Sequence, residues 1–323
     1  MRYFAAFLLC GLTALSSSFA EDAQLRARAF ELVEHSREVS TTKQSVANET
    51  VLTFHAVGTD GITREGTYTR VFVFHTGVRE EITFGNFHLV KIDLPDRVAF
   101  IGPSRVLPPE VRAALELFPI WMWQLDHEDV VRAIRQTNRK GQPAQCIEFD
   151  TIAGSQTNNN ELCLDAQTGA QIYDRSGNTE LENSAFFDFA GAKYPAHIRQ
   201  YQNGVLKVDI QLTRRVIEDQ VNADIFTPPP GADVGLRCQT FRRAFAQSMP
   251  QPAGNGGAVT NIVIHAVIGL DGKLHDAVIE NSDRPDLNDE ALRVAQGWTF
   301  TPAMCNGQPN AQEADLTVRF QGR

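Results

Sequence analysis

The sequence predicts an α+β protein, in which an antiparallel half-barrel with helices in its concavity precedes a small β-β-α-β domain. Three observations support this fold class. Apolar and polar residues alternate along much of the chain, and alternation with a period of two is typical of half-buried strands. Two patterns with helical spacing interrupt these strands near the middle of the chain. A stretch containing proline and glycine, residues 231–257, then separates the strand-rich region from the last part of the sequence.

The first twenty residues have the pattern of a secretory signal. Arg2 supplies a positive start, an apolar run follows from residue 3 to residue 15, and small residues occupy Ser18 and Ala20. This arrangement is typical of a signal peptide that is cleaved after Ala20. The alternative is an uncleaved membrane anchor, but the apolar run is shorter than the roughly 20 residues that a spanning helix needs. We therefore expect export, and a mature chain that begins at Glu21.

Composition argues against a nucleic-acid-binding protein, and the absence of catalytic motifs argues against an enzyme. The chain has 323 residues, which is long enough for two domains, and a formal net charge of −9. An acidic chain without a basic cluster is a poor partner for nucleic acid. Because the sequence has no nucleophile elbow, zinc-binding helix motif or phosphate-binding loop, we expect no catalytic residue, metal or cofactor. Asp126, His127 and Glu128 are interpreted as the charged start of a helix.

The cysteines predict two disulfides. Five cysteines are present, and removal of a signal peptide that includes Cys10 leaves an even number, which is typical of an exported chain with paired cysteines. Cys146 and Cys163 occupy similar positions in two strand-like runs joined by a polar turn, so a hairpin would place them within disulfide reach. Cys238 and Cys305 then pair by elimination. Free buried thiols are the alternative. The spacing is unlike that of a redox or zinc motif.

The region before residue 231 is predicted to consist of strands with helices inserted. Residues 22–36 have apolar side chains at helical spacing, and residues 45–100 are rich in β-branched and aromatic residues separated by turns. One helix is expected to begin at Pro109 and a second at Asp126. Strands then return, and Asn203-Gly204 is a strong signal for a hairpin. Such an antiparallel sheet can curl around its helices as an open half-barrel.

This region resembles the lipoprotein-carrier superfamily of the bacterial envelope, the LolA/LolB-like half-barrels. The resemblance extends over residues 24–230 and depends most on Tyr194-Pro195, the hairpin at Asn203-Gly204 and the segment 224–231. It implies a half-barrel that holds an acyl chain or an apolar segment of a partner. Possible lining residues of such an apolar cavity are Phe118, Trp121, Met122 and Trp123. The alternative interpretation is that these side chains simply fill the core.

The last part of the chain is predicted to be a β-β-α-β unit. A strand ending at Gly269 and a strand from residue 273 to residue 282 are joined by a tight turn that contains Asp271-Gly272. Asn288 is expected to cap a helix whose apolar residues include Trp298. A final strand follows, in which Leu316, Val318 and Phe320 alternate with polar residues.

This unit closely resembles the TonB carboxy-terminal domain family, over about residues 254–321. The residues that match the family, in order and spacing, are Gly269–Gly272, Val278–Ser282, Pro285–Leu292, Trp298–Ala303, Asn306-Gly307 and Val318–Phe320. The resemblance implies a domain that adds a β-strand from an outer-membrane receptor to the edge of its own sheet. The partner-binding edge would be the last strand, Asp315, Leu316, Thr317, Val318, Arg319 and Phe320. Energy transduction does not follow, because the membrane anchor and proline-rich spacer of a transducing TonB protein are missing from the sequence.

The predicted organisation is a signal peptide (1–20), a LolA/LolB-like half-barrel (21–231), a linker (232–257) and a TonB-like domain (258–323). Two functions remain open. The protein is either a periplasmic accessory protein that binds an envelope protein through its last domain, or a lipid or lipoprotein carrier or sensor that uses the half-barrel. No remaining structural element follows the last strand in the sequence, so we expect its outer edge to be uncovered.

Overall fold

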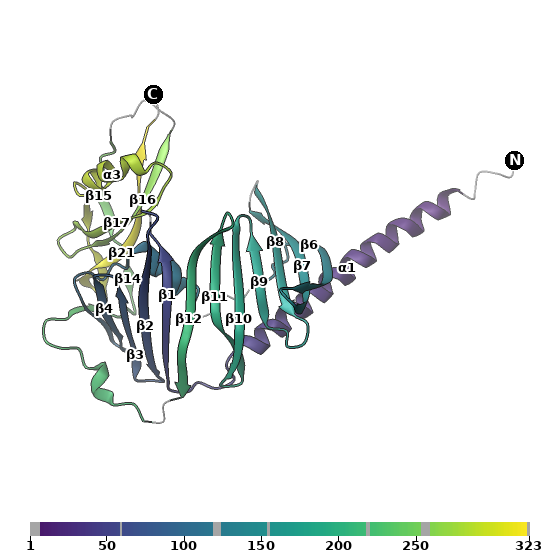
Figure 1. The fold of residues 1–323 in the computed structure, drawn as a ribbon. Helices are drawn as coiled ribbons and strands as arrows, with labels where there is room; N and C mark the ends of the chain where they lie inside the picture. Colours follow the sequence, from purple (N-terminus) through teal and green to yellow (C-terminus); the bar gives the residue numbers. More distant parts are fainter. Residues whose placement is uncertain are drawn as a thin grey trace. The chain divides into compact units, whose positions relative to one another are not determined.

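The computed structural model describes residues 7–58, 60–118, 124–153, 156–217, 220–252 and 259–321, with side chains from residue 22 onward. The chain forms two compact units, Met1–Ser45 with Glu116–Thr213, and Val46–Leu115 with Arg214–Arg323. The fold is mostly antiparallel β with few helices, and a small β-rich domain ends the chain (Figure 1). Among the described residues, no helix combines the length and apolar character needed to cross a bilayer.

Unit 1 is an antiparallel sheet with one long helix. The helix is α1 (Phe7–Ser40), and it contains the helix predicted at residues 22–36. The strands, in hydrogen-bonded order, are β12 (Val205–Ile217, most of which lies in this unit), β11 (Ala192–Gln202), β10 (Thr179–Phe189), β9 (Gln171–Ser176), β8 (Gln156–Asp165), β7 (Gln142–Ala153) and β6 (Val130–Arg139). The predicted hairpin is present, with Asn203 and Gly204 at φ values of 52° and 74° between paired strands. These positive values match a two-residue turn of the kind that Asn-Gly favours.

The helix packs on one face of this sheet through residues one turn apart. Ala29 and Val33 of α1 are buried against a cluster formed by alternate residues of two neighbouring strands. The buried strand residues of this cluster are Ile147 and Phe149 of β7 and Leu162 and Leu164 of β8, together with Leu125. Their neighbours along each strand, such as Cys146 and Cys163, lie on the other face. The apolar pattern that predicted the helix therefore also determines which sheet face it covers.

The helix predicted at Asp126 is wrong. Residues 126–129 form a turn, in which the Asp129 carboxylate accepts a hydrogen bond from the Asp126 N–H at 2.8 Å, and β6 follows from Val130. Val131 and Ile134 both pack toward α1, which is the side expected for them in the predicted helix. In the strand they reach the same side because a bulge in the ladder with β7 lies between them. The β-branched residues and the neighbouring strand β7 favour a strand here, although the apolar residues also have helical spacing.

Unit 2 begins with strands that match the predicted β region. In hydrogen-bonded order they are β13 (Asp233–Leu236), β5 (Arg97–Ile101), β4 (Phe87–Asp93), β3 (Gly77–Phe84), β2 (Thr63–Val73) and β1 (Asn48–Val57). One face of these strands packs against the 3-10 helix η1 (Ala223–Phe226), through Phe226 and Ile92. The helix predicted at Pro109 is present as α2 (Pro109–Glu116).

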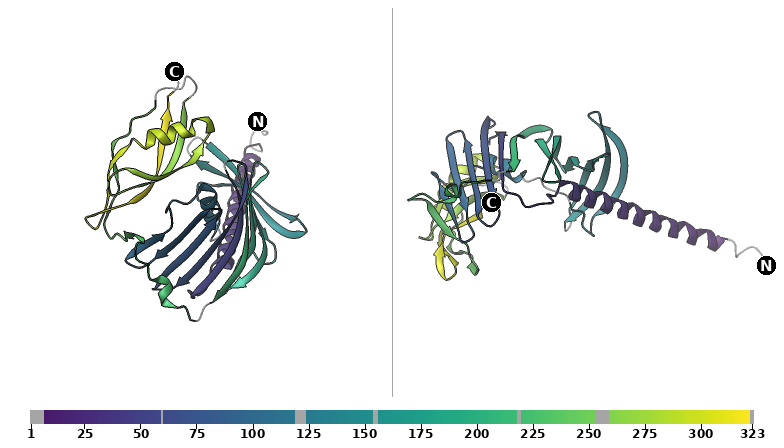
Figure 2. Two further views of the ribbon diagram at one scale, coloured as in Figure 1. Left: turned by 60° about the vertical axis from the view of Figure 1, so that its left-hand side comes forward. Right: turned by 90° about the horizontal axis from the view of Figure 1, so that it is seen from below.

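The rest of unit 2 is the small carboxy-terminal domain. Its main sheet has the order β17 (Leu274–Ser282), β16 (Thr260–Ile268) and β21 (Gln312–Phe320), and α3 (Asn288–Ala295) contacts all three strands (Figures 1 and 2). Short strands complete it: β14 (Phe241–Arg242), β15 (Phe245–Ser248), β18 (Thr299–Thr301), β19 (Ala303–Cys305) and β20 (Gln308–Asn310). The order strand, strand, helix, strand is the one predicted.

Asn288 does not cap this helix as predicted. The 3-10 helix η2 (Pro285–Leu287) continues directly into α3, so Leu287 is the capping residue and Asn288 has helical dihedral angles. The proline at the first position of η2 starts the helical path earlier than the pattern of apolar residues suggested.

The segment expected as a linker contains regular structure in its described part. The strand β13 pairs with β5, β14 pairs with β19, and β15 pairs with β18. Its proline and glycine content therefore did not indicate an unstructured connection. The position of the domain boundary itself stays a prediction.

Both predicted disulfides are present. Cys146 and Cys163 are direct partners in the β7–β8 ladder and are bonded to each other. Cys238 is bonded to Cys305, which lies in β19 at a sequence separation of 67 residues. The hairpin argument and the elimination argument are both confirmed.

Candidate functional site

The last strand, β21, is at the edge of the carboxy-terminal sheet. Its residues pair one by one with β16, from Thr260 opposite Phe320 to Ile268 opposite Gln312. In the described part of the chain no other strand forms a ladder with β21. One row of backbone groups therefore faces away from the sheet. Edge strands of this kind can template pairing with another chain.

Side chains of β21 alternate between the core and the surface as predicted. Val318 and Phe320 are buried in one cluster with Trp298, which is itself fully buried, and Leu316 is half-buried beside them. Asp315, Thr317 and Arg319 are exposed on the other face. Because one face of the strand is fixed in the core, its register cannot slip by one residue without burying charge.

A hydrogen bond at Arg319 shows which backbone groups of β21 face outward. The N–H of Arg319 donates to Gln251 Oε1 at 2.8 Å, so it is directed away from β16. Alternate residues of a strand direct their N–H and C=O groups to the same side. The N–H groups of Glu313, Asp315 and Thr317 therefore also face outward. This row of amides is the feature that an added strand would use.

The edge is partly covered, contrary to expectation. Residues 244–252, called the strap below, contact β21 at two points. The Ala244 N–H donates to Gln312 Oε1 at 2.8 Å at one end, and Gln251 accepts from Arg319 at the other. The strap is held in place by Trp298, whose indole N–H donates to the Pro250 carbonyl at 2.9 Å. The prediction missed this cover because it considered only residues that follow β21, whereas the strap precedes β16.

The strap reaches β21 through side chains and not through a backbone ladder. Its contacts engage Gln312 and Arg319, which flank the central part of the strand. Between them, the outward amides of Glu313, Asp315 and Thr317 have no protein acceptor among the hydrogen bonds of the described residues. The part of the edge that makes no hydrogen bond with the strap is therefore residues 313–317, between the two strap contacts.

Charged side chains mark the exposed face of this part of the sheet. His265 of β16 lies opposite Asp315, with Nδ1 at 2.6 Å from Asp315 Oδ1 and Nε2 at 3.4 Å from Glu313 Oε2. The imidazole is largely buried, whereas both carboxylates are well exposed. Two carboxylates thus share one histidine. At least one negative charge stays uncompensated by it in either protonation state of the ring.

The family-like motifs have structural roles around this sheet. Gly272, in the turn between β16 and β17, has a φ of 71°, and a Cβ atom there would lie 2.1 Å from the Phe300 carbonyl oxygen. Asn306 accepts hydrogen bonds on its side-chain oxygen from the N–H groups of Gln239 and Thr240. These contacts fix the segment that carries Cys238 beside the domain. These two motifs therefore support the domain's scaffold and do not line the edge.

A second candidate site is a cavity of about 480 Å³ in unit 2. Its apolar lining residues come from β3, β4, β5 and the region of α2, and they are Ile82, Leu89, Val98, Phe100, Leu107 and Leu115. Charged residues that also line it are Glu80, Lys91, Asp93, Arg105, Arg237 and Glu313. Several of these pair with each other, as do Lys91 and Glu80 at 3.3 Å. The cavity is thus apolar with an ion-paired border, which suits an amphipathic ligand.

The aromatic residues predicted to line a cavity do not define this one. Phe118 is half-buried and is not among the cavity's lining residues. Trp121, Met122 and Trp123 lie outside the described residues. Sequence reasoning missed the actual lining because it comes from alternate residues of three separate strands, whose common face becomes visible only when the strands pair.

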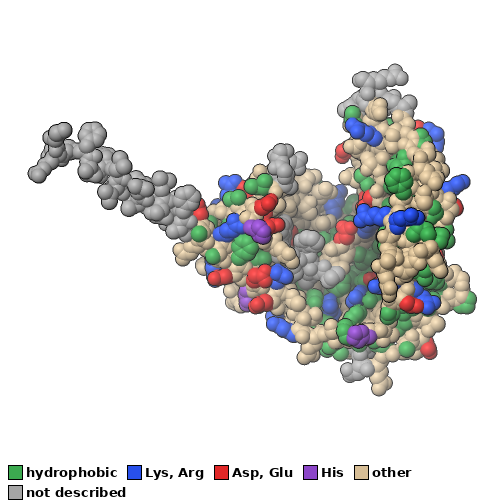
Figure 3. Space-filling view, turned by 180° about the vertical axis from the view of Figure 1, so that it is seen from behind, with side chains coloured by type: hydrophobic (Ala, Val, Ile, Leu, Met, Phe, Trp, Pro, Cys, Tyr) green, Lys and Arg blue, Asp and Glu red, His purple; other side chains and the backbone are tan. Residues whose placement is uncertain are grey.

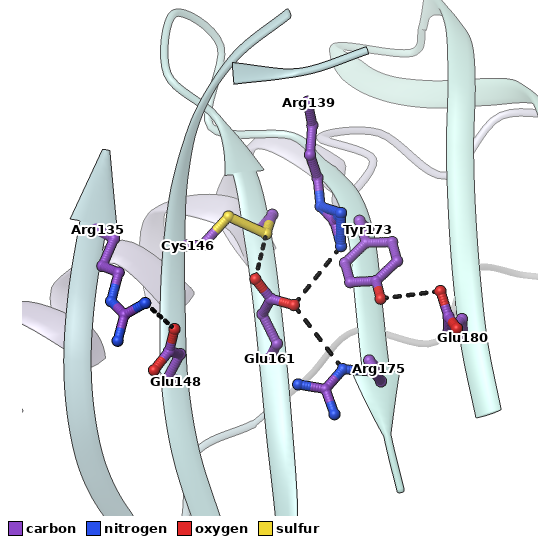
Figure 4. Close-up of a disulfide and its surroundings, with 9 residues drawn as sticks. Arg135, Arg139, Cys146, Glu148, Glu161, Tyr173, Arg175 and Glu180 are labelled. Carbon is purple, nitrogen blue, oxygen red and sulfur yellow. Dashed lines mark hydrogen bonds and ion pairs between the residues drawn. A yellow bond between two sulfur atoms is a disulfide. The ribbon is translucent and has the colours of Figure 1, made fainter. Parts of the chain in front are cut away.

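The sheet of unit 1 has its own charged face around the Cys146–Cys163 disulfide (Figure 4). Glu161 lies between Arg139 at 3.6 Å and Arg175 at 3.9 Å. The Arg139 guanidinium also stacks on the Tyr173 ring, at 3.2 Å from its centroid. The cysteine sulfurs and Glu161 are close enough together to hold a metal ion, but both sulfurs are used in the disulfide. Metal binding by this set would first require reduction.

Comparison with known proteins identifies the small domain. Residues 247–321 match the family model of the Gram-negative bacterial TonB protein C-terminal domain. This confirms the resemblance predicted from the motifs, and the match begins inside the segment expected as a linker. No curated protein matches the chain.

Solved structures are similar to the region before this domain. A LolA superfamily protein from Nitrosomonas europaea is 12% identical and matches with a TM-score of 0.37 over 61% of this chain and 96% of its own. The Pseudomonas aeruginosa MucA/MucB complex matches with a TM-score of 0.28 at 12% identity, over 75% of this chain and 81% of that chain.

Proposed function

We propose that this protein is a periplasmic accessory binding protein that docks envelope proteins by adding a strand from the partner to β21. The observation that carries the proposal is the row of outward N–H groups at Glu313, Asp315 and Thr317 on an edge strand whose other side is fixed in the core. Main-chain hydrogen bonds would supply affinity, and the exposed side chains would supply selectivity. An outer-membrane receptor is the first partner to test.

The match of residues 247–321 to the TonB carboxy-terminal family supports this function. Two disulfides support a location outside the cytoplasm, since paired cysteines persist in oxidising compartments such as the periplasm. In this proposal the signal at residues 1–20 directs export, and the larger sheet serves as a half-barrel that carries the docking domain. Binding and not catalysis is the activity.

Proline substitution tests the proposal. Thr317→Pro removes an outward backbone donor, and proline is tolerated at edge positions that face away from the ladder. The variant should keep its fold and lose most of the partner binding seen in a pull-down from envelope extract. Thr317→Ala keeps the donor and serves as the control for the side chain. Val318→Pro is the opposite control, because its donor faces β16 and the domain should unfold.

Two results would count against this function. Unfolding of Thr317→Pro would mean that its amide is paired within the protein. A folded variant that still binds every envelope partner of the parent would mean that strand addition through this amide is not the mode of docking. Circular dichroism of the same preparations separates the two results.

A second candidate function is carriage of a lipid, and the cavity of about 480 Å³ favours it. Its apolar lining from β3, β4 and β5 could enclose part of an acyl chain while Arg105 or Arg237 meets a carboxylate or phosphate. Native mass spectrometry of protein purified from its own envelope should then detect a bound lipid. Leu107→Trp would fill the cavity and should abolish that signal. A Trp123→Ala variant tests the sequence-based prediction separately.

A further inference from the structure

The charges on residues 313–317 of β21 specify the partner more closely than strand addition alone. Resting on the proposed function, we infer that β21 accepts a strand with two basic residues separated by one position, placed opposite Glu313 and Asp315. Both carboxylates project from the exposed face of β21, and both are at least two-fifths exposed. An added strand would place its own alternate side chains directly beside them.

The surroundings leave this acidic pair available. His265 contacts both carboxylates from β16, but a single imidazole can compensate only one negative charge. The three cationic residues of the cavity that Glu313 lines have other anionic partners: Lys91 pairs with Glu80, Arg237 with Asp93, and Arg105 with Asp233 at 3.7 Å. The edge therefore has a net negative charge where a partner strand would lie.

The strap fixes where these pairs form. Its hydrogen bonds leave the outward amides between Gln312 and Arg319 unused, so an added strand that pairs with these amides has Glu313 and Asp315 within its ladder. The pattern of two basic residues with any one residue between them is the same in both chain directions. The pattern therefore holds for parallel and for antiparallel addition. Only the spacing of two residues is required, because side chains on one face of a strand recur with that period.

Short strand-forming peptides test this inference on the full-length protein. One peptide has Lys-X-Lys at its centre, a second has Glu-X-Glu, and a third repeats the lysine peptide with N-methylated backbone amides. The lysine peptide should bind roughly tenfold more tightly than the glutamate peptide, as two modest cross-strand charge pairs would produce. The N-methylated peptide has the same charge but cannot form a ladder. Equal binding of the two lysine peptides would show simple attraction to an acidic protein and would overturn the inference.

Charge variants provide the matched controls. Glu313→Gln with Asp315→Asn should abolish the preference for the lysine peptide, and Glu313→Lys with Asp315→Lys should reverse it. Asp283→Asn with Asp289→Asn removes two exposed charges elsewhere in the domain and should leave the preference unchanged. If loss of the His265 contacts unfolds a double variant, Asp315→Asn alone should reduce the preference by about half on a logarithmic scale. An unchanged preference in the folded variants contradicts the inference.

The outcomes also separate this inference from the proposed function. If both peptides bind equally and Thr317→Pro abolishes both, strand addition stands and the charge pattern is wrong. If no peptide binds, the edge does not accept strands and both are wrong. Protection of the Asp315 and Thr317 amides from hydrogen exchange on binding of the lysine peptide would locate the ladder at the predicted part of β21.

Discussion

The sheet of unit 1 and the sheet of the carboxy-terminal domain use charge in different ways. On the disulfide face of unit 1, Glu161 lies between two arginines, and Glu182 pairs with both Lys140 and Arg199. On the carboxy-terminal sheet, two carboxylates share His265. Figure 3 shows charged side chains of both signs among apolar ones on another view of the surface. On the face of unit 1 each of these carboxylates is balanced by basic side chains of the same sheet. On the carboxy-terminal sheet the negative charge is only partly balanced, so a basic partner can still pair with it.

The two sheets also differ in how they are held together. Unit 1 has long strands and a helix packed across them, and its disulfide joins residues that are already ladder partners. The small domain has three main strands and depends on cross-links to segments that lie far away in sequence, through Cys238–Cys305 and the strap. Small domains commonly need such additions, because they bury less apolar surface per residue. The predictions below test this contrast.

The largest effect should follow removal of the Cys238–Cys305 disulfide. Replacing both cysteines with alanine should lower the free energy of unfolding by about 4 kcal/mol, since the bond closes a 67-residue separation. The matched variant, with Cys146 and Cys163 replaced by alanine, closes a separation of 17 and should lose about 3 kcal/mol. Urea unfolding of both variants measures the difference. A larger loss from the hairpin disulfide would contradict the view that the small domain depends more on its cross-link.

The next effect concerns the turn between β16 and β17. Gly272→Ala should destabilise the domain by about 3 kcal/mol, because a β-carbon there combines a left-handed backbone with a clash against the Phe300 carbonyl oxygen. Gly307→Ala is the control in the same domain. Gly307 also has a positive φ, 82°, but a Cβ atom there would meet no atom within 4 Å, so the loss should be near 1 kcal/mol. Similar losses at both positions would mean that the close approach to Phe300 relaxes at little cost.

A buried carboxylate in unit 1 should give the corresponding effect in the larger sheet. Asp165 accepts hydrogen bonds from the Thr168 hydroxyl at 2.7 Å, the Gln142 side chain at 2.7 Å and the Thr168 N–H at 2.7 Å. Burial alone would raise the pKa of Asp165, but these hydrogen bonds hold its pKa below the ordinary value. Asp165→Asn should therefore lower the free energy of unfolding by about 2 kcal/mol at neutral pH, as expected for hydrogen bonds to a charged group.

The pH dependence of this effect has a defined sign. Because the folded pKa is depressed, the wild-type carboxylate stabilises the fold above its unfolded pKa of about 4, and this contribution is lost as the pH falls through the folded pKa. The difference between wild type and Asp165→Asn should accordingly shrink below pH ~4. Urea midpoints measured along an acid series check this. A difference that is constant with pH would assign the effect to packing.

The sequence predicted features that depend on neighbours along the chain and missed features that depend on paired strands. The helix at residues 22–36, the hairpin at Asn203-Gly204 and the alternation of β21 are local patterns, and all three are present. The strand β6 was mistaken for a helix because β-branched residues at helical spacing fit both structures until β7 supplies a partner.

The candidate site shows the same division. The edge position of β21 followed from the resemblance to the TonB carboxy-terminal family. Its cover by the strap did not, because Gln251 reaches β21 from a segment that looked like a linker. The contact between His265 and Asp315 depends on the register of β16 against β21, which no local pattern specifies. Residue types alone therefore could not show that two carboxylates share one histidine.

The smallest effect tests the contrast between the two charged faces directly. Glu161→Gln removes the central anion between Arg139 and Arg175, and should lower the free energy of unfolding by up to about 1 kcal/mol, as partly exposed ion pairs do. Glu313→Gln with Asp315→Asn removes two like charges that lie close together, so it should change stability by less than about 0.5 kcal/mol or slightly increase it. Both variants belong in one series of urea titrations at neutral pH, repeated at high salt. Salt should reduce the loss from Glu161→Gln, because screening weakens favourable pairs in the wild type. If neutralising the edge carboxylates costs more than neutralising Glu161, then His265 makes those carboxylates part of the domain's stability. The acidic edge would then be a structural ion pair, and the contrast between a matched face and an unmatched one would be wrong.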